Sequence, residues 1–379
     1  MIATATATEL FLPPFVLFGR GALDQLGQRA HGFGRRALVI TDRGLVATGL
    51  VGRATEALQA AGIDSIVFDR VEPNPTVTQV EAAIAAGAGH GVDMLVSIGG
   101  GSAHDCAKMV ALVATNGGDV RDYEGTDRAA GPGLPLVAVN TTAGTGADVS
   151  RFAVISDTER KVKMVIADRR VVPAVAINDP LTTTRMPKAV TMASGLDALT
   201  HAVEAYASTA ASDFTDLLSL RAVELVNRHL TRAIEHGDDL DAREGMMLAS
   251  LYAGLAINSA LVGATHALAH ALGALLDLPH GVCNGILLPH VCVANYASRR
   301  QRYDKLATIF GGAADGKRLP ESLRRLGDRA GLPRGLGAIG VTRAHIPDLV
   351  ERALADMTMS TNPRPLTRAD VAAIYERAL

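Results

Sequence analysis

The sequence predicts an α/β domain followed by an all-helical domain. In the first half, short apolar strand patterns alternate with helical stretches at the spacing of a parallel sheet. From about residue 185 the strand patterns nearly vanish, and helical periodicity runs to the C-terminus. The 379 residues are enough for about two domains. We therefore expect an α/β domain over residues 1–180 and an all-α domain over residues 181–379.

The α/β half begins its regular pattern at residues 36–41 (RALVIT), which are typical of a short buried strand ending at Asp42. Residues 72–76 (EPNPT) predict a loop, because two prolines remove backbone donors and restrict the chain. Further strands are expected at residues 64–69, 93–98, 135–139 and 174–178, with a β-hairpin at 150–156 and 161–166. Helices are expected at residues 49–61, at 77–90 and from Ser102 to about Val113.

The second half predicts helices with short connections. Pro279 and Gly281 flank His280, which places this histidine in a turn before a helix. The helices are expected at residues 187–209, 213–233, 242–259, 263–276, 281–297, 301–310, 319–330, 344–356 and 367–378.

The composition is that of an ordinary globular protein, with 48% hydrophobic and 20% charged residues. A net charge of -2 gives no electrostatic reason to expect nucleic acid or an anionic membrane as a partner. The apolar stretch at residues 260–279 contains two histidines and an aspartate, so we expect a buried helix and no membrane span. Three cysteines without a CxxC motif indicate reduced thiols and a cytoplasmic location.

Two glycine-rich loops predict a phosphate-binding cradle. Gly99, Gly100, Gly101 and Ser102 follow a strand and open a helix, so the backbone can approach a ligand closely and free N–H groups face it. The second loop, residues 141–146 (TTAGTG), follows the strand at 135–139 and would complete the cradle. The alternatives are a tight strand-to-helix turn for the first loop and an ordinary polar turn for the second.

Asp42 is the candidate for cofactor selection, because it ends the first parallel strand. A carboxylate there can accept hydrogen bonds from the adenosine ribose and repels a 2′-phosphate, which favours NAD over NADP. The alternative is a helix N-cap or turn aspartate.

The strongest functional signal is a group of metal-ligand residues. Asp197 and His201 are four apart, as are His266 and His270, and residues at this spacing share a helix face. His280 follows closely. A carboxylate with neutral imidazoles suits Fe(II) or Zn(II). For any single histidine the alternative is a structural role on a helix.

Taken together, these stretches resemble the iron-containing (group III) alcohol dehydrogenase family. The resemblance rests on VEPNPT (71–76), GGGSAHDCAK (99–108), TTAGTG (141–146) and the spacing of Asp197, His201, His266 and His280. It runs from about residue 14 to the C-terminus. Residues 151–170 and 278–291 look most like the branch of 1,3-propanediol dehydrogenase and NAD-dependent methanol dehydrogenase.

The resemblance implies a dehydroquinate synthase-like fold, with a dinucleotide-binding α/β domain and the site in the cleft before the helical domain. It implies NAD and Fe²⁺ as cofactors, with Zn²⁺ or Mn²⁺ as alternatives to iron. His270 matches a histidine near the reacting carbon that is not a ligand. The implied metal ligands are Asp197, His201, His266 and His280, and the implied cofactor contacts are Asp42, Gly99, Gly100, Gly101, Ser102, Thr141, Thr142, Thr145 and Lys163.

The implied reaction is the interconversion of a short primary alcohol or diol and its aldehyde, in a homo-oligomer that is a dimer or larger. Within the same scaffold, a glycerol-dehydrogenase-like or maleylacetate-reductase-like enzyme remains an alternative. A dehydroquinate-synthase-like lyase is a further one, but it would need a cluster of basic residues, and few Lys or Arg lie among the motifs of the second half.

Overall fold

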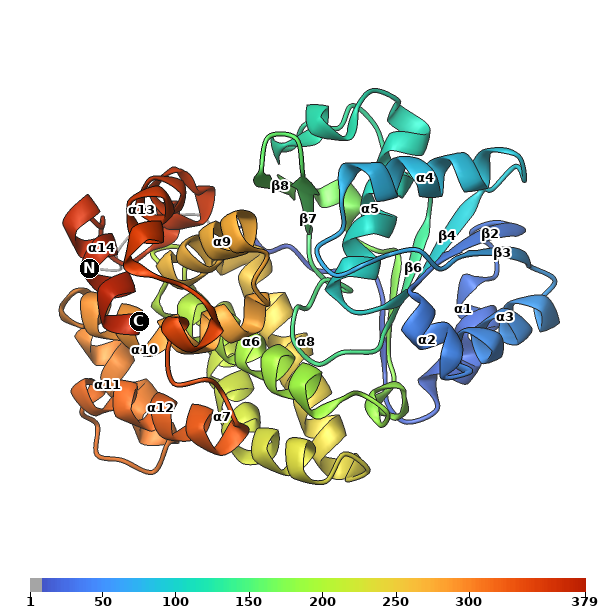
Figure 1. Cartoon of the computed structure of the whole chain (residues 1–379). Coiled ribbons are helices and arrows are strands. Elements are labelled where there is room, and N and C mark those ends of the chain that lie inside the picture. The colour runs from blue at the N-terminus through green and yellow to red at the C-terminus, as the bar shows by residue number, and fades with distance from the viewer. Residues whose placement is uncertain (1–8) are drawn as a thin grey trace, which may run out of the picture.

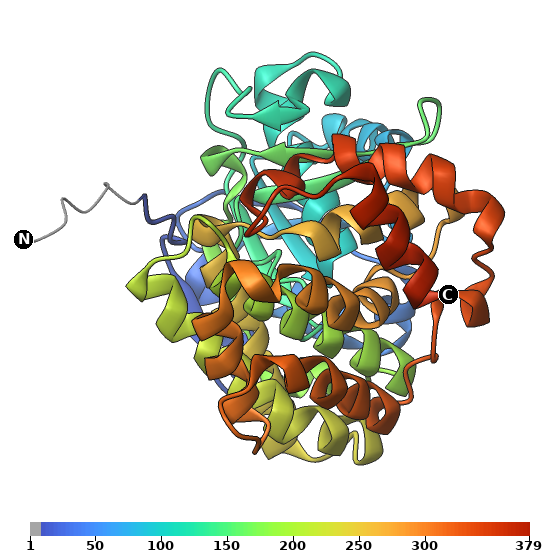
Figure 2. The ribbon, with the colours of Figure 1, turned by 90° about the vertical axis from the view of Figure 1, so that its left-hand side faces the viewer.

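The computed structural model describes residues 9–379 and contains an α/β region and a helical region side by side (Figure 1). The fold class predicted from the sequence is confirmed. Turning the molecule by 90° places the helical region in front of the α/β region (Figure 2).

The α/β region is built on a six-stranded parallel sheet in the order β1-β9-β6-β4-β2-β3. Buried apolar runs form its central strands, as expected for a sheet covered on both faces. The strands are β1 (Val16–Phe18), β2 (Arg36–Ile40), β3 (Asp64–Phe68), β4 (Met94–Gly99), β6 (Leu136–Asn140) and β9 (Val175–Asn178).

Alternating side chains of each strand pack against opposite layers of helices. Leu38 and Ile40 of β2 pack towards α4 (Val77–Ala88) and α5 (Gly101–Asn116). Ala37 and Val39 pack on the other side against α1 (Leu26–Ala30) and α3 (Leu50–Ala60). Strand alternation therefore produces the doubly covered sheet.

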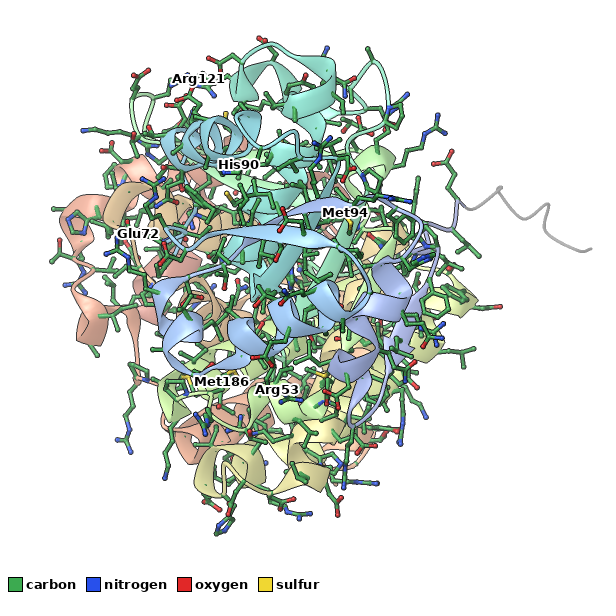
Figure 3. The ribbon with its side chains drawn as sticks, turned by 90° about the vertical axis from the view of Figure 1, so that its right-hand side faces the viewer. Arg53, Glu72, His90, Met94, Arg121 and Met186 are labelled. Atoms are coloured by element: carbon green, nitrogen blue, oxygen red, sulfur yellow. The ribbon has the colours of Figure 1, made fainter. Side chains whose placement is uncertain are left out.

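A small second sheet packs against α5 and α4. β7 (Phe152–Asp157) and β8 (Val162–Ala167) form the predicted antiparallel hairpin, and β5 (Gly125–Thr126) pairs with β8. Arg121, next to this sheet, lies at the upper edge of the molecule (Figure 3). β1, β5 and the short helix α2 (Arg43–Ala47) were not expected from the sequence, because each is too short to show a periodic pattern.

Each predicted helix of the second half is present, and no end differs by more than two residues. His280 is the first residue of its helix, close to the predicted position. The helices are α6 (Lys188–Ala207), α7 (Asp213–Glu235), α8 (Leu240–Ala260), α9 (Ala264–Leu276), α10 (His280–Asn295), α11 (Arg300–Ile309), α12 (Leu319–Ala330), α13 (Ile346–Ala355) and α14 (Arg368–Ala378).

The helical region is organised around α6, whose second half is almost entirely buried. α7, α8 and α10 all pack against it. Within residues 9–379, no single helix has the length and apolar composition of a membrane span. α8 and α9 meet those criteria only as a pair, and that pair is bent by 102°.

Candidate metal and dinucleotide site

Helix α6 presents three ionisable side chains on one buried face. Asp197, His201 and Glu204 are spaced by four and three residues, so they lie one above the other along the helix. Their exposed fractions are only 3%, 6% and 6%. Charged groups are almost never this buried without partners, so their contacts indicate function.

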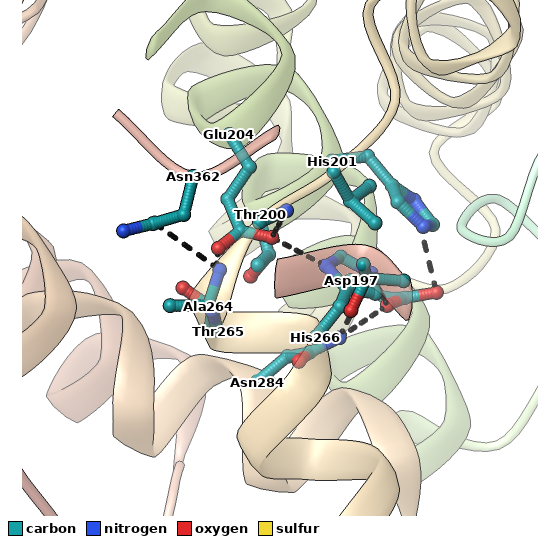
Figure 4. Close-up of polar contacts among 12 residues, drawn as sticks. Asp197, Thr200, His201, Glu204, Ala264, Thr265, His266, Asn284 and Asn362 are labelled. Carbon is teal, nitrogen blue, oxygen red and sulfur yellow. Dashed lines mark hydrogen bonds and ion pairs between the residues drawn. The ribbon is translucent and has the colours of Figure 1, made fainter. Parts of the chain in front are cut away.

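Glu204 joins α6 to α9 and was missed in the sequence analysis. It accepts hydrogen bonds from the backbone N–H groups of Gly263 (2.9 Å) and Thr265 (2.6 Å), and so caps a helix whose own N-cap residue is a glycine. It also contacts Nδ1 of His266 at 2.7 Å (Figure 4). Burial alone would raise the pKa of Glu204, but these donors lower it. Glu204 thereby turns Nε2 of His266 towards Asp197.

The donor atoms of three helices converge beside Asp197. Asp197, His201 and His266 each offer a ligand atom, and these atoms all lie within 4.8 Å of one another. Nε2 of His280, at the start of α10, lies 3.5 Å from Oδ1 of Asp197. The amide nitrogen of Asn284 contacts Asp197, His266 and His280 at 2.8, 3.3 and 3.0 Å. All four predicted ligand residues are thus brought together.

The chemistry of this donor set fits a divalent metal ion. Burial lowers the pKa of His201 to about 4 and holds that of His280 well below its ordinary value, so both rings are neutral and can act as ligands. For His266, burial lowers the pKa, but the ion pair with Glu204 outweighs it and raises the pKa. Among the described residues, the buried Nδ1 of His201 has no hydrogen-bond partner. One carboxylate and three imidazoles match iron or zinc.

His270 lies one turn beyond His266 and contacts a different carboxylate. Its Nδ1 is 2.8 Å from Oδ2 of Asp356, a residue of the segment that follows α13. Burial would raise the pKa of Asp356, but His270 and Thr358 lower it. The rings of His270 and His280 stack with centroids 5.2 Å apart. His270 is therefore oriented by Asp356, with its Nε2 left for the pocket.

One pocket of about 230 Å³ brings the two halves of the chain together. Its walls include Asp197, His201, His266, His270 and His280 from the helical region, and Gly101, Ser102, Thr145 and Lys163 from the α/β region. The remainder is mostly apolar and includes Phe152, Ile257, Leu261 and Val262. The other predicted cofactor residues, Asp42, Gly99, Gly100, Thr141 and Thr142, do not line this pocket.

Close packing between the two glycine-rich loops explains why positions 100 and 101 are occupied by glycine. A Cβ at Gly100 would lie 2.7 Å from the Thr142 methyl carbon, and one at Gly101 would lie 2.9 Å from that of Thr145. The second loop packs just as closely on the helical region, since a Cβ at Gly144 would meet the Ser194 carbonyl at 2.6 Å. The N-cap of α5 is Gly100, which carries no side-chain cap. This arrangement fits a dinucleotide pyrophosphate at the start of α5.

The family models match nearly all of the chain. Residues 13–180 match "Iron-containing alcohol dehydrogenase", and residues 191–379 match "Fe-containing alcohol dehydrogenase family, C-terminal". The chain belongs to the iron-containing alcohol dehydrogenase family. It is therefore an oxidoreductase that interconverts alcohols and aldehydes.

Several relatives align with the chain over nearly their full length. The chain is 42% identical to alcohol dehydrogenase 4 of Saccharomyces cerevisiae (strain YJM789), covering 99% of both chains. It is 39% identical to NAD-dependent methanol dehydrogenase of Bacillus methanolicus, covering 98% of this chain and 100% of the relative. The crystal structure of a 1,3-propanediol oxidoreductase superposes with a TM-score of 0.96 at 40% identity, covering 99% and 100%. These similar identities do not single out one substrate.

Two predicted cofactor residues of this alcohol dehydrogenase have protein contacts of their own. Asp42 accepts a hydrogen bond from the Leu45 backbone at 3.0 Å, so it is the N-cap of α2, as the alternative interpretation had it. It still stands at the carboxyl end of β2, beside the strand that ends at Gly99. Lys163 donates to Oδ1 of Asn74 at 2.6 Å, and burial lowers its pKa.

Proposed function

We propose that this chain is an NAD-linked dehydrogenase of short primary alcohols or diols that uses Fe(II), with Zn(II) or Mn(II) as alternative metals. The observation that carries the proposal is the shared pocket. It joins the histidine cluster and the first residues of α5 to an apolar wall, so a polar reacting end and a short carbon chain both have a place.

The metal would be held by Asp197, His201, His266 and His280, and the dinucleotide by the two glycine-rich loops with Asp42 and Lys163. When bound, the metal supplies a Lewis acid that makes the alcohol proton easier to lose, and NAD supplies the hydride acceptor. Glu204 keeps His266 in the tautomer whose Nε2 faces Asp197. The second glycine-rich loop docks against α6 through Gly144 and Ser194, which fixes the distance between the two binding regions.

His270 is proposed as the group that passes the alcohol proton to solvent. Its Nδ1 bond to Asp356 fixes the ring, so Nε2 is available on the pocket side. We expect His270→Ala to retain metal but to lose turnover, with an altered pH–rate profile. An unchanged pH–rate profile would contradict the relay role, because the profile reports the acid and base groups used in the reaction.

The charge of the pocket favours an uncharged substrate. Lys163 is the single Lys or Arg among the described residues that line it, and it is already bonded to Asn74. A phosphorylated or doubly anionic substrate would require more cationic groups. The scarcity of cationic groups supports a simple alcohol as substrate over the substrates of the lyase and maleylacetate-reductase alternatives. It does not distinguish a simple alcohol from a polyol such as glycerol, which is also uncharged.

We also propose a cytoplasmic homo-oligomer. All three cysteines are buried and unpaired, as suits a reducing compartment. Leu10, Leu12 and Phe15 are exposed immediately before β1, which is an edge strand of the main sheet. Sedimentation equilibrium checks the oligomer: a mass of two chains or more is expected, and a monomer at all concentrations would contradict it.

The reaction is tested with metal-free protein reconstituted separately with Fe(II), Zn(II) or Mn(II). NADH absorbance is followed on a panel of short alcohols, diols and glycerol, with NADP in parallel. Metal-dependent reduction of NAD on short alcohols is the expected result. Reduction of NAD only with glycerol, or turnover only of a keto acid, would replace the substrate assignment; equal use of NADP would remove the selective role of Asp42.

A further inference from the structure

Leu261 has a backbone conformation that leucine rarely adopts. At φ 60° and ψ -168° it lies in a region used almost only by glycine. The other non-glycine residues of the described chain with positive φ are Asn74, Asp127, Lys161 and Asp277, all polar and mostly of the types that tolerate such angles. Leu261 is the apolar exception, and it follows directly after α8.

Hydrogen bonds on both sides hold this backbone in place. Ser208 Oγ donates to the Ala260 carbonyl and Thr361 Oγ1 donates to the Val262 carbonyl, both at 2.5 Å. Gly263, which follows Val262, donates its backbone N–H to Glu204, and the same carboxylate also positions His266. The backbone path of residues 260–263 is therefore fixed by these hydrogen bonds, one of which goes to the carboxylate that positions His266, whichever side chain stands at position 261.

The Leu261 side chain faces the pocket. It lines the cavity together with Phe152, Ile257 and Val262. Among the described residues it neither belongs to nor packs against any of the hydrophobic cores, and it is only half-buried. Its apolar surface thus contributes to the pocket wall and to no core.

A glycine at position 261 would satisfy the same hydrogen bonds without backbone strain. What a leucine adds is a four-carbon side chain in the cavity. We propose that Leu261 is a specificity-determining residue that shortens the apolar end of the pocket and excludes longer alcohols. This inference rests on the proposed alcohol dehydrogenase function and names its substrate class as alcohols with a short carbon chain.

The test uses the metal- and NAD-loaded enzyme with 1-propanol and 1-hexanol. Leu261→Gly and Leu261→Ala are both expected to raise the hexanol-to-propanol ratio of kcat/KM by about 10-fold or more, because a few methylene groups gain room. Leu255, a half-buried leucine within α8 that packs against Val149, Ala176 and Leu251, supplies the matched controls Leu255→Gly and Leu255→Ala. Neither control should change the ratio.

Thermal unfolding separates strain from the lost side chain. At position 261 the glycine variant should have a higher Tm than the alanine variant, because only glycine relieves the backbone. At position 255 the order should reverse, because glycine inside a helix costs more than alanine.

Wild-type turnover of propanol with an unchanged ratio in both 261 variants would overturn the specificity role while leaving the proposed function intact. Absence of wild-type turnover on every alcohol would overturn both.

Discussion

The histidine cluster and part of the glycine-rich cradle line one pocket but are built on opposite principles. In the helical region, side chains from α6, α9 and α10 supply the donor atoms around Asp197. In the α/β region, the contribution of Gly100 and Gly101 is the absence of a side chain, which lets two loops pack within contact of each other. One half of the site is specified by added groups and the other by missing ones.

This difference predicts different consequences of substitution. Removing a donor should abolish metal binding without disturbing the cradle. Adding a methyl group to the cradle should displace the dinucleotide without removing the metal. Separate measurements of metal and NAD affinity therefore distinguish the two halves.

The largest effect is expected for His266→Ala. It removes a donor atom and leaves Glu204 buried without its histidine partner, so metal and activity should be lost together. The loss in metal affinity should exceed the roughly 100-fold that removing an outer partner costs. His290→Ala is the control, since His290 lies outside the cluster and should retain metal. Full activity in a metal-free His266→Ala protein would contradict the ligand assignment.

Gly101→Ala tests the cradle. The added Cβ would lie 2.9 Å from the Thr145 methyl carbon, so Thr145 must shift, and we expect the Kd for NAD to rise about 10-fold. Metal affinity should stay unchanged. Gly52→Ala in α3 has open space around its Cβ and should bind NAD normally with a slightly raised Tm. Isothermal titration calorimetry measures the Kd for NAD in both variants. Normal NAD binding by Gly101→Ala would contradict the assignment of these loops as the dinucleotide-binding cradle.

An intermediate effect is expected for Glu204→Gln. The amide keeps the shape but loses the charge that orients His266, and such outer partners are worth about 10–100-fold in metal affinity. The Kd for NAD should be unaffected. Glu224→Gln, an exposed pair partner of Arg221 on α7, is the control. If Glu204→Gln binds metal as tightly as this control, the carboxylate serves only to cap α9.

The smallest effect on activity is expected for Asp157→Asn, because the Asp157 side chain does not line the pocket. Arg121, with Arg160 and backbone donors, holds the pKa of Asp157 below its ordinary value of 3.8. The folded carboxylate therefore adds stability above about pH 4, and this contribution disappears as the pH falls towards the lowered pKa.

Asp157→Asn should accordingly lower Tm by a few degrees at neutral pH, and the gap should close below pH 4. Asp24→Asn breaks only an exposed pair with Arg53 and should change Tm little. A gap that does not depend on pH would show that the charge of Asp157 is not what stabilises the β7–β8 hairpin.

The sequence revealed those parts of the site that are encoded by spacing. Asp197 with His201, and His266 with His270, share helix faces, and this local periodicity was enough to identify them. Glu204 lies on the same face, seven residues beyond Asp197, and the same spacing argument could have found it. The position of the two glycine-rich loops directly after strands predicted the cradle, and the family resemblance named the individual cofactor residues within them.

What the sequence could not reveal depends on contacts between distant segments. Asp356 lies 86 positions from His270, and no local pattern connects them. A side chain at Gly101 would clash with Thr145, a residue of the second glycine-rich loop that lies more than forty positions later in the chain. The strain at Leu261 likewise depends on Ser208 and Thr361, which hold the carbonyls of its neighbours Ala260 and Val262. The domain boundary at residue 181 stays a prediction.

The most direct test is anomalous diffraction from crystals loaded with Zn(II) or Fe(II). One strong peak is predicted at roughly 2.0–2.2 Å from one oxygen of Asp197 and one ring nitrogen each of His201, His266 and His280. His270 should remain bonded to Asp356 and outside that distance. A peak elsewhere in the molecule, or one coordinated by His270 in place of a member of this set, would contradict the account.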